Sequence, residues 1–367
     1  MISFRLHRRP RGRCFRRRLA AGAAPLLTAL VLVTSIPAVA RASSPPPPAA
    51  PATPTFIIVN GAAGDPAYGD VFTRQVATWE KTATTLGARS IIIGRDPAEA
   101  PAAAANDRTR LQQSLAAESQ DGTAPLWLVL IGHGTFDTRS ARFNLRGDDL
   151  TATDLASWLQ PIRRPLAVIN TASASAPFLK ALSGPDRIVI TATRSGNEQN
   201  YTRFGTSLAT ALTDPATDLD QDGQVSLLAA FLTAAANVTE FYQSEGRLAT
   251  EHALIDDNGD SLGTPASWFR GLRATRKPTN APATDGPRAH QWLLTPDTAA
   301  ATQPPDWIAR RDALEAALAT LRDQKDSLPP ADYSRQLEST LLDLARHYEN
   351  GPGLPDAPAN PPAPRTP

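Results

Sequence analysis

Cysteine is almost absent from this chain, and its single occurrence limits the chemistry open to the protein. The one cysteine among 367 residues is Cys14, which lies in a segment that we expect to be removed. The remaining chain has no thiol that could form a disulfide, bind a metal ion or attack a substrate. Thiol chemistry is therefore excluded for the expected mature protein.

The N-terminal segment combines a basic start with an apolar run. Residues 1–42 contain nine arginines and no acidic residue, and residues 19–40 are mostly apolar. Small residues near the end of this run offer cleavage sites, so 1–42 is predicted to be a signal peptide. Pro25, Pro37 and the shortness of the run argue against a retained membrane anchor. The mature protein is expected to be secreted or periplasmic, by the general or the twin-arginine route.

Basic clusters are missing from the chain after residue 42. Residues 1–42 hold nine of the 37 basic residues and none of the 36 acidic ones, so their removal changes the formal net charge from +1 to −8. A protein this acidic is a poor candidate to bind nucleic acid or an anionic membrane surface. We therefore expect no nucleic-acid partner and, after signal cleavage, no membrane partner.

Proline-rich stretches divide the rest of the chain. Residues 43–54 form a linker, 266–304 a Pro/Thr/Ala-rich connector, and 350–367 a tail without the capacity for a core. Residues 55–265 have a globular composition and are enough for one sizeable domain. Residues 305–349 form a separate helical segment.

Short apolar runs in residues 55–265 end in small or polar residues. The runs are 56–61, 126–134, 166–175 and 187–197, with a fifth at 90–94 that lacks the polar end. Runs that are apolar on both faces are typical of parallel strands covered by helices. Helix-like stretches separate them, at 71–86, 108–119, 152–159 and 204–213. The sequence therefore predicts an α/β fold with a mostly parallel sheet.

His133 follows one of these runs and lies between Gly132 and Gly134. In open α/β sheets, ligands bind outside the carboxyl ends of the strands. The glycines lack side chains, which allows a sharp turn and a close approach to the imidazole. The next run ends in the hydroxyl-rich segment TASAS, residues 171–175. A base and a hydroxyl at two strand ends form a candidate catalytic pair; the alternative is that His133 only caps its strand.

The order of these elements resembles a known family. Three strands follow one another, and each has a characteristic end. The first ends in His-Gly, the second in the pattern small residue–nucleophile–any residue–Ser, and the third in Thr-Ala. This order resembles the caspase-like fold of clan CD cysteine peptidases. The legumain branch is the most similar, and the resemblance covers residues 55–265. It implies a three-layer α/β/α sandwich. The site residues that it implies are the catalytic pair His133 and Ser173, with Asn60, Gly132, Gly134, Thr171, Ser175 and Thr193 lining the pocket.

The chain departs from that family where the chemistry would occur. Ser173 falls on the nucleophilic cysteine, Thr171 on an acidic residue, Ala176 on a glycine, and Ala63 on an asparagine that legumains carry. A thiol with a pKa of about 8.5 is partly ionised near neutrality, whereas a serine hydroxyl needs a firmly held base. We therefore expect a pseudopeptidase that binds a peptide or protein ligand. The alternatives are an active peptide hydrolase with a Ser173–His133 dyad, and an assembly or scaffold protein.

Two acidic segments raise the question of calcium. Asp218, Asp220 and Asp222 are spaced as at the start of an EF-hand loop, but the twelfth place, which needs a bidentate glutamate, is Ala229. Residues 254–263 form a second acidic patch, whose simplest interpretation is a turn. We expect a weak calcium site at most, and otherwise no cofactor.

The C-terminal segment predicts a helical hairpin. Mostly apolar residues recur at seven-residue spacing in two stripes, separated by Pro329 and Pro330. The stripes are Leu314, Leu318, Leu321, Lys325 and Leu328, and then Tyr333, Leu337, Leu341, Leu344 and Tyr348. Two helices alone bury little apolar surface, so the hairpin is expected to dock on the domain or on a partner chain, including self-association.

Overall fold

The computed structural model describes residues 53–95, 106–221, 223–294, 304–325 and 327–351. The predicted signal peptide, most of the first linker and almost all of the predicted tail lie outside the described residues. Among the helices that are described, none combines the length and the apolarity needed to cross a bilayer.

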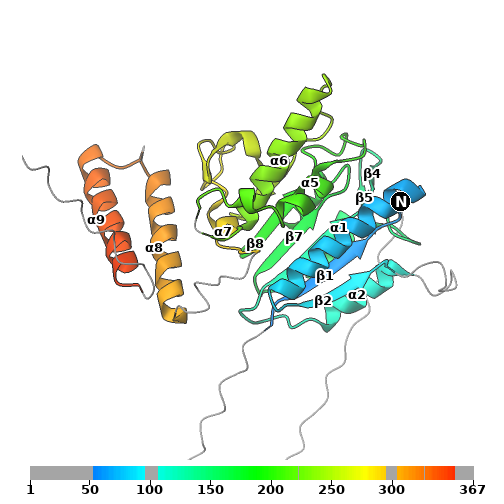
Figure 1. The fold of residues 1–367 in the computed structure, drawn as a ribbon, viewed down its shortest axis with the longest axis horizontal. Coiled ribbons are helices and arrows are strands. Elements are labelled where there is room, and N and C mark those ends of the chain that lie inside the picture. The colour runs from blue at the N-terminus through cyan, green and yellow to red at the C-terminus, as the bar shows by residue number, and fades with distance from the viewer. Residues whose placement is uncertain (1–52, 96–105, 222, 295–303, 326, 352–367) are drawn as a thin grey trace, which may run out of the picture. The chain divides into compact units, whose positions relative to one another are not determined.

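A seven-stranded sheet forms the centre of the domain, with the strand order β10-β9-β8-β7-β3-β1-β2 (Figure 1). Its strands are β1 (Thr55–Asn60), β2 (Arg89–Ile93), β3 (Leu126–Ile131), β7 (Leu166–Asn170), β8 (Arg187–Thr191), β9 (Leu254–Asp256) and β10 (Thr264–Pro265). The first five are parallel to one another, and β9 and β10 are antiparallel to their neighbours. The predicted α/β class with a mostly parallel sheet is confirmed by this topology.

The strands are apolar on both faces because helices cover both faces. Every residue of β3 and of β7 is buried. Phe56 and Ile58 of β1 belong to one apolar cluster, and Ile57 and Val59 to the other, as the alternation of side chains along a strand requires. The three-layer arrangement follows from these two clusters.

Two sets of helices make up the outer layers. The first cluster contains residues of α1 (Pro66–Thr85), α5 (Phe204–Ala211) and α6 (Leu227–Ser244). The second contains residues of α2 (Asp107–Ala117), α3 (Ala152–Leu159) and α4 (Ala176–Leu182). α1, α2, α3 and α5 correspond to the four predicted helical stretches. α4 follows the hydroxyl-rich end of β7, and α6 follows the first acidic segment.

Local sequence signals fix where the helices begin. Asp65 accepts a hydrogen bond from the backbone N–H of Ala67 at 2.8 Å, and Pro66 stands at the first position of α1. Ser226 accepts from the backbone N–H of Ala229 at 3.1 Å and so starts α6. The helix that follows the first acidic segment is thus capped by a serine hydroxyl.

The predicted connector 266–304 differs from the structure over most of its length. Residues up to 294 form η2 (Ala266–Trp268), β11 (Phe269–Arg270), β12 (Arg273–Ala274) and α7 (Pro287–His290). Asp285, Ala289 and Leu294 are buried. The sequence did not predict these elements, because each is only two to four residues long and lies in a proline-rich stretch. Residues 295–303 lie outside the described residues.

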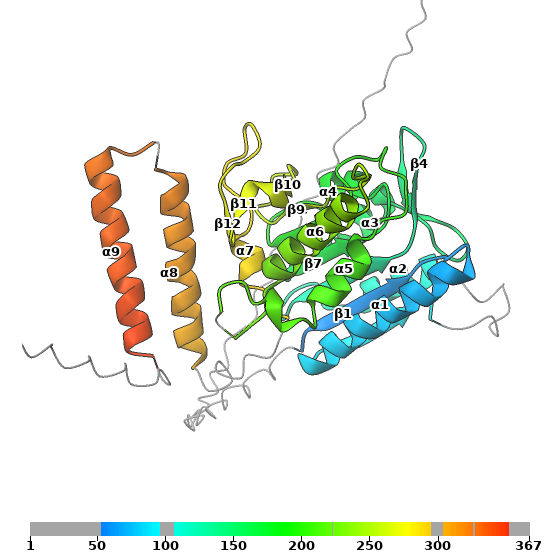
Figure 2. The ribbon, with the colours of Figure 1, turned by 45° about the horizontal axis from the view of Figure 1, so that its top comes forward.

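The C-terminal segment forms two helices, α8 (Pro305–Asp323) and α9 (Pro330–Glu349), drawn in orange and red in Figure 2. Pro329 precedes the first turn of α9. Trp307 stacks on His347 with ring centroids 4.6 Å apart, which joins the start of α8 to the end of α9. The predicted stripe of α8 is buried at Leu314, Leu318 and Leu321, whereas α9 has no buried residue among those described.

A pair of buried carboxyl groups joins the last strands to α7. Asp257 accepts from the backbone N–H groups of Gly286 and Ala289, both at 2.8 Å. Asp285 accepts from the backbone N–H of Asp257 at 3.0 Å and from the hydroxyl of Thr264. Burial raises the pKa of both carboxyl groups, and with the neighbouring charge of Asp257 it raises the pKa of Asp285 to about 8. Asp257 of the second acidic patch therefore has a structural role. The buried pair of Asp257 and Asp285 is called the clasp below.

This clasp predicts a stability that falls as the pH rises. Between the ordinary pKa of 3.8 and about 8, the folded protein keeps a proton on Asp285 that the unfolded chain releases. The free energy of unfolding should fall with pH in this window, with a slope of up to about 1.4 kcal/mol per unit for one proton. Asp285→Asn should flatten the slope, because the amide keeps the shape without titrating. Urea unfolding from pH 5 to 8 measures it.

Asp70→Asn is the matched control for that experiment. Asp70 is an exposed residue of α1, away from the clasp, and its replacement should leave the slope of the wild-type protein unchanged. Equal slopes in the wild-type and Asp285→Asn proteins would contradict a proton held at Asp285.

Candidate functional site

His133 follows the end of β3 and lies against three aromatic rings. Its ring centroid is 4.7 Å from that of Tyr68, 5.1 Å from that of Phe72 and 6.0 Å from that of Tyr201. Its Nε2 atom is 3.1 Å from the carbonyl oxygen of Ala63. Burial lowers the pKa of His133, and the hydrogen bond to Ala63 partly opposes this effect. The site therefore favours a neutral imidazole near neutral pH.

The contact with Ala63 also decides where the proton of this imidazole lies. A carbonyl oxygen only accepts hydrogen bonds, so the proton of the neutral ring is on Nε2 and the lone pair is on Nδ1. No carboxylate orients His133 among the residues that the structure describes. Asp137, the nearest acid in the sequence, accepts from the backbone N–H of Ser140 at 2.8 Å within its own turn.

Ser173 follows the end of β7 and is directed at a backbone group. Its side chain is buried, and Oγ donates to the carbonyl oxygen of Gly134 at 2.9 Å and accepts from the N–H of the same residue at 3.2 Å. No hydrogen bond links Ser173 to His133 in the described part of the chain. The two predicted catalytic residues therefore lie at neighbouring strand ends, but the hydroxyl is engaged elsewhere.

The two glycines beside His133 serve close packing. A Cβ atom on Gly134 would lie 2.1 Å from the carbonyl oxygen of Ser173, and one on Gly132 would lie 3.0 Å from the ring of Phe143. Neither glycine has a positive φ. The sequence predicted a sharp turn and close access to the imidazole, whereas the close neighbours are the Ser173 backbone and the Phe143 ring.

The remaining pocket residues of the prediction are used in internal hydrogen bonds. Thr171 donates its hydroxyl to the carbonyl oxygen of Leu130 at 3.0 Å. The hydroxyls of Ser175 and Thr193 are 3.1 Å apart, and both residues are buried. Asn60 donates to the carbonyl oxygen of Gly94 at 3.2 Å. These side chains tie the strand ends together.

Glu198 contacts the Ser173 turn and pairs with His252, and neither residue was predicted. Ala174 has a φ of 51°, in the left-handed region, and its N–H donates to the carbonyl oxygen of Glu198 at 2.7 Å. The Glu198 carboxylate is 2.6 Å from Nδ1 of His252. The sequence signal for Glu198 was its position soon after a strand with a polar end. Its contact with Ala174 joins residues that are distant in the sequence, so the sequence alone could not indicate it.

The first acidic segment is spread over separate contacts. Asp218 accepts from the backbone N–H of Gly223 at 2.9 Å, and Asp220 lies 3.7 Å from Nε2 of His290. Asp222 lies outside the described residues. Within the described ranges, no three histidine, cysteine, aspartate or glutamate side chains gather as a metal site would require. The weak calcium site stays a prediction.

No family model matches this chain, and no curated protein matches it. Solved structures do align with it. The Drosophila initiator caspase Dronc aligns with 13% identity and a TM-score of 0.34, over 56% of this chain and 79% of its own. Caspase-1 from Spodoptera frugiperda aligns with 10% identity and a TM-score of 0.32, over 56% and 85%.

A structural-genomics protein from Geobacter sulfurreducens aligns with 10% identity and a TM-score of 0.32, over 51% of this chain and 89% of its own. Alignments at these TM-scores carry no conclusion about activity. The fold class therefore stands on the topology of the sheet and its two helical layers.

The packing at the strand ends predicts opposite effects for two glycine substitutions. Gly134→Ala should destabilise the protein by about 2 kcal/mol or more, because the new methyl group collides with the backbone of Ser173. Gly69→Ala should stabilise it by about 0.5 kcal/mol, because Gly69 lies inside α1 and its Cβ would have only an ordinary 3.6 Å contact. Chemical denaturation measures both, and a neutral Gly134→Ala would refute the close approach.

Proposed function

We propose that this protein is an exported caspase-like peptidase homologue that binds a peptide or protein without cleaving it. The observation that carries the proposal is the position of the Ser173 hydroxyl, which is bonded to both backbone groups of Gly134. A serine nucleophile needs its proton in contact with a base. Here the proton points to a carbonyl oxygen, and that oxygen cannot remove it.

The surrounding groups add to this argument. His133 directs its Nε2 proton at the carbonyl oxygen of Ala63, and within the described residues no hydrogen bond joins its ring to Ser173. The N–H of Gly134 is also occupied by Ser173 and is not available to hold an oxyanion. Loss of one such donor typically costs about a hundredfold to a thousandfold in rate. Together these contacts favour a binding role.

The proposal includes a location and a limited role for calcium. The basic and apolar N-terminal segment supports export to a secreted or periplasmic location, and the net charge of the mature chain supports a peptide or protein ligand over nucleic acid. Without a glutamate at the twelfth place, the acidic loop supports weak calcium binding at most.

A scaffold function is the second candidate, and one observation favours it. Leu341 and Leu342 of α9 are 41% and 46% exposed, although they belong to the helix whose apolar stripe should be covered. Such a face on an amphipathic helix is typical of a surface that docks on another chain. Self-association or partner docking through α9 is compatible with a binding role for the domain.

The wild-type protein is expected to leave peptides uncleaved, whatever residue precedes the scissile bond. A digest of a peptide library with purified mature protein, followed by mass spectrometry, measures this. Ser173→Ala and His133→Ala serve as controls for contaminating proteases. Cleavage by the wild type that disappears in both variants would overturn the proposal in favour of a Ser173–His133 hydrolase.

Ser173→Cys is expected to create a reactive thiol beside His133. Sulfur is larger than oxygen and forms weaker hydrogen bonds, so it fits poorly between the backbone groups that hold the hydroxyl at 2.9 and 3.2 Å. A thiol also needs less activation than a hydroxyl. A thiol-directed peptidyl probe should label this variant, and a second substitution, His133→Ala, should reduce labelling about tenfold or more.

Ser175→Cys is the matched control for that labelling. Ser175 is two residues away and equally buried, but its hydroxyl faces Thr193. The new thiol is the only one in the mature chain in both variants, because Cys14 lies in the predicted signal peptide. Labelling of the Ser175 variant alone, or of neither folded variant, would show that position 173 does not face a ligand site.

A further inference from the structure

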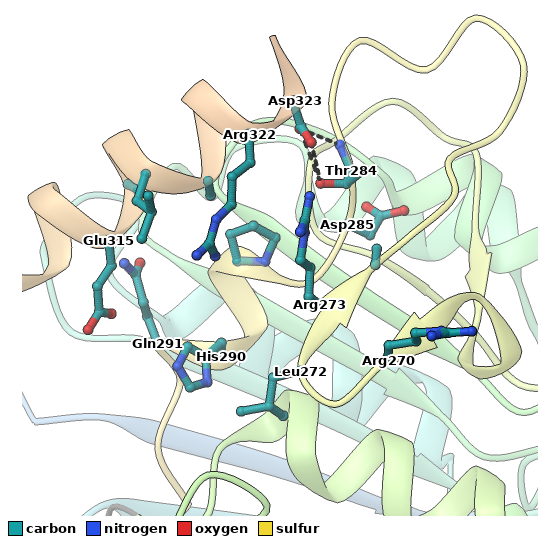
Figure 3. A pocket seen from close by; sticks show the side chains of 15 residues that line it. Arg270, Leu272, Arg273, Thr284, Asp285, His290, Gln291, Glu315, Arg322 and Asp323 are labelled. Atoms are coloured by element: carbon teal, nitrogen blue, oxygen red, sulfur yellow. Dashed lines mark hydrogen bonds between the residues drawn. The ribbon is translucent and has the colours of Figure 1, made fainter. Parts of the chain in front are cut away.

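A cavity of about 290 Å³ lies between α8 and the segment that contains β11, β12 and α7. Figure 3 shows its lining, with α8 along one wall and the β11–β12 turn along the other. Thr284 closes one end, since its N–H and hydroxyl donate to the carboxylate of Asp323 at 2.9 and 3.0 Å. This cavity is separate from the strand ends that carry His133 and Ser173.

Two guanidinium groups reach into this cavity without a counter-ion. Arg322 extends from α8 and Arg273 from β12, on facing walls (Figure 3). Within the ranges that the structure describes, neither side chain makes an ion pair or a hydrogen bond. By contrast, Arg288 lies 2.7 Å from Asp186, and Arg311 lies 2.9 Å from Asp312.

Among the described residues, none of the carboxyl groups that line the cavity forms an ion pair with these two arginines. Asp323 accepts from Thr284, and Glu315 accepts from the hydroxyl of Tyr348 at 2.9 Å. The third, Asp285, is buried in its clasp with Asp257, and its raised pKa leaves it with little negative charge near neutrality. Within the described residues, the N–H donors of both guanidinium groups therefore stay open to a ligand.

Charge and shape together indicate the class of ligand. A guanidinium group donates charge-assisted hydrogen bonds in a geometry that matches a phosphate or a carboxylate, so an oxyanion can accept from both arginines. Leu272, Leu318 and Ala319 supply apolar wall next to them. A volume of about 290 Å³ suits a small molecule rather than a folded partner.

We propose that this cavity binds a small ligand through an oxyanion group, a phosphate or a carboxylate, held by Arg273 and Arg322. The apolar part of the ligand lies against Leu272 and Leu318. Because Arg322 belongs to α8 and Arg273 to β12, the bound anion joins the C-terminal hairpin to the domain.

The test is calorimetric titration of the mature protein with phenyl phosphate and with benzoate, at constant ionic strength. Phenol is the neutral control, and inorganic phosphate reports the anion without the ring. Binding of either aromatic anion but not of phenol is expected, and the preferred anion distinguishes phosphate from carboxylate. Arg273→Gln and Arg322→Gln should each weaken binding roughly tenfold or more.

Arg310→Gln is the matched control, because Arg310 is an exposed residue of α8 that does not line the cavity. It should leave the affinity unchanged. Circular dichroism verifies that all three variants are folded. No binding of any anion at millimolar concentration, or equal affinities in the three variants, would overturn the proposal.

Discussion

The hydrogen bonds between the Ser173 hydroxyl and the backbone of Gly134 join the two strand ends on which the candidate site is built. β3 and β7 are paired in parallel register, so their carboxyl ends lie at one edge of the sheet. The hydroxyl bridges the residues that follow these ends, and Gly134 has to be a glycine because the Ser173 carbonyl occupies the position of a Cβ. Removing either partner would leave a buried polar group unpaired, which costs about 1–3 kcal/mol.

That bridge has a chemical consequence as well as a structural one. A hydroxyl suits a short, two-sided hydrogen bond to a peptide group, whereas a thiol is a weak donor and a weak acceptor. Serine at position 173 is therefore well matched to holding the strand ends together and poorly matched to attacking a substrate. The hydroxyl that would act as the nucleophile at this edge of the sheet is also the group that stabilises the edge. Binding at this edge would keep the advantages of a rigid frame without requiring the hydroxyl to move.

The predictable parts of the fold are those that depend on neighbours in the sequence. Runs such as 126–131 are apolar at every position, and this alone identifies a strand buried on both faces. α3 has the predicted bounds, and the structure shows that Thr151 caps its first turn. The position of His133 and Ser173 at neighbouring strand ends followed from the alternation of strands and helices.

The partners of polar side chains were not predictable, because they are distant in the sequence. Tyr201 packs near His133 from 68 residues away, and Asp285 interlocks with Asp257 across a stretch whose composition resembles a linker. Whether Ser173 faces an imidazole or a peptide group depends on separations of a few ångströms at the strand ends. Hydrophobic periodicity in the sequence carries no information about such separations. The sequence therefore indicated that His133 and Ser173 lie at neighbouring strand ends, but it could not indicate the groups with which either side chain pairs.

The two C-terminal helices show the same limit for apolar residues. Both carry a regular apolar stripe, yet Leu314, Leu318 and Leu321 of α8 are buried while Leu341 of α9 is 41% exposed. The repeat defines a face of each helix, and only the neighbouring surface decides whether that face is covered. For α8 that surface includes the cavity lined by Arg273 of β12 and Arg322 of α8 itself. An anion that accepted hydrogen bonds from both arginines, as proposed above, would add a contact between α8 and the domain. The docking of α8 would then be tighter when the cavity is occupied.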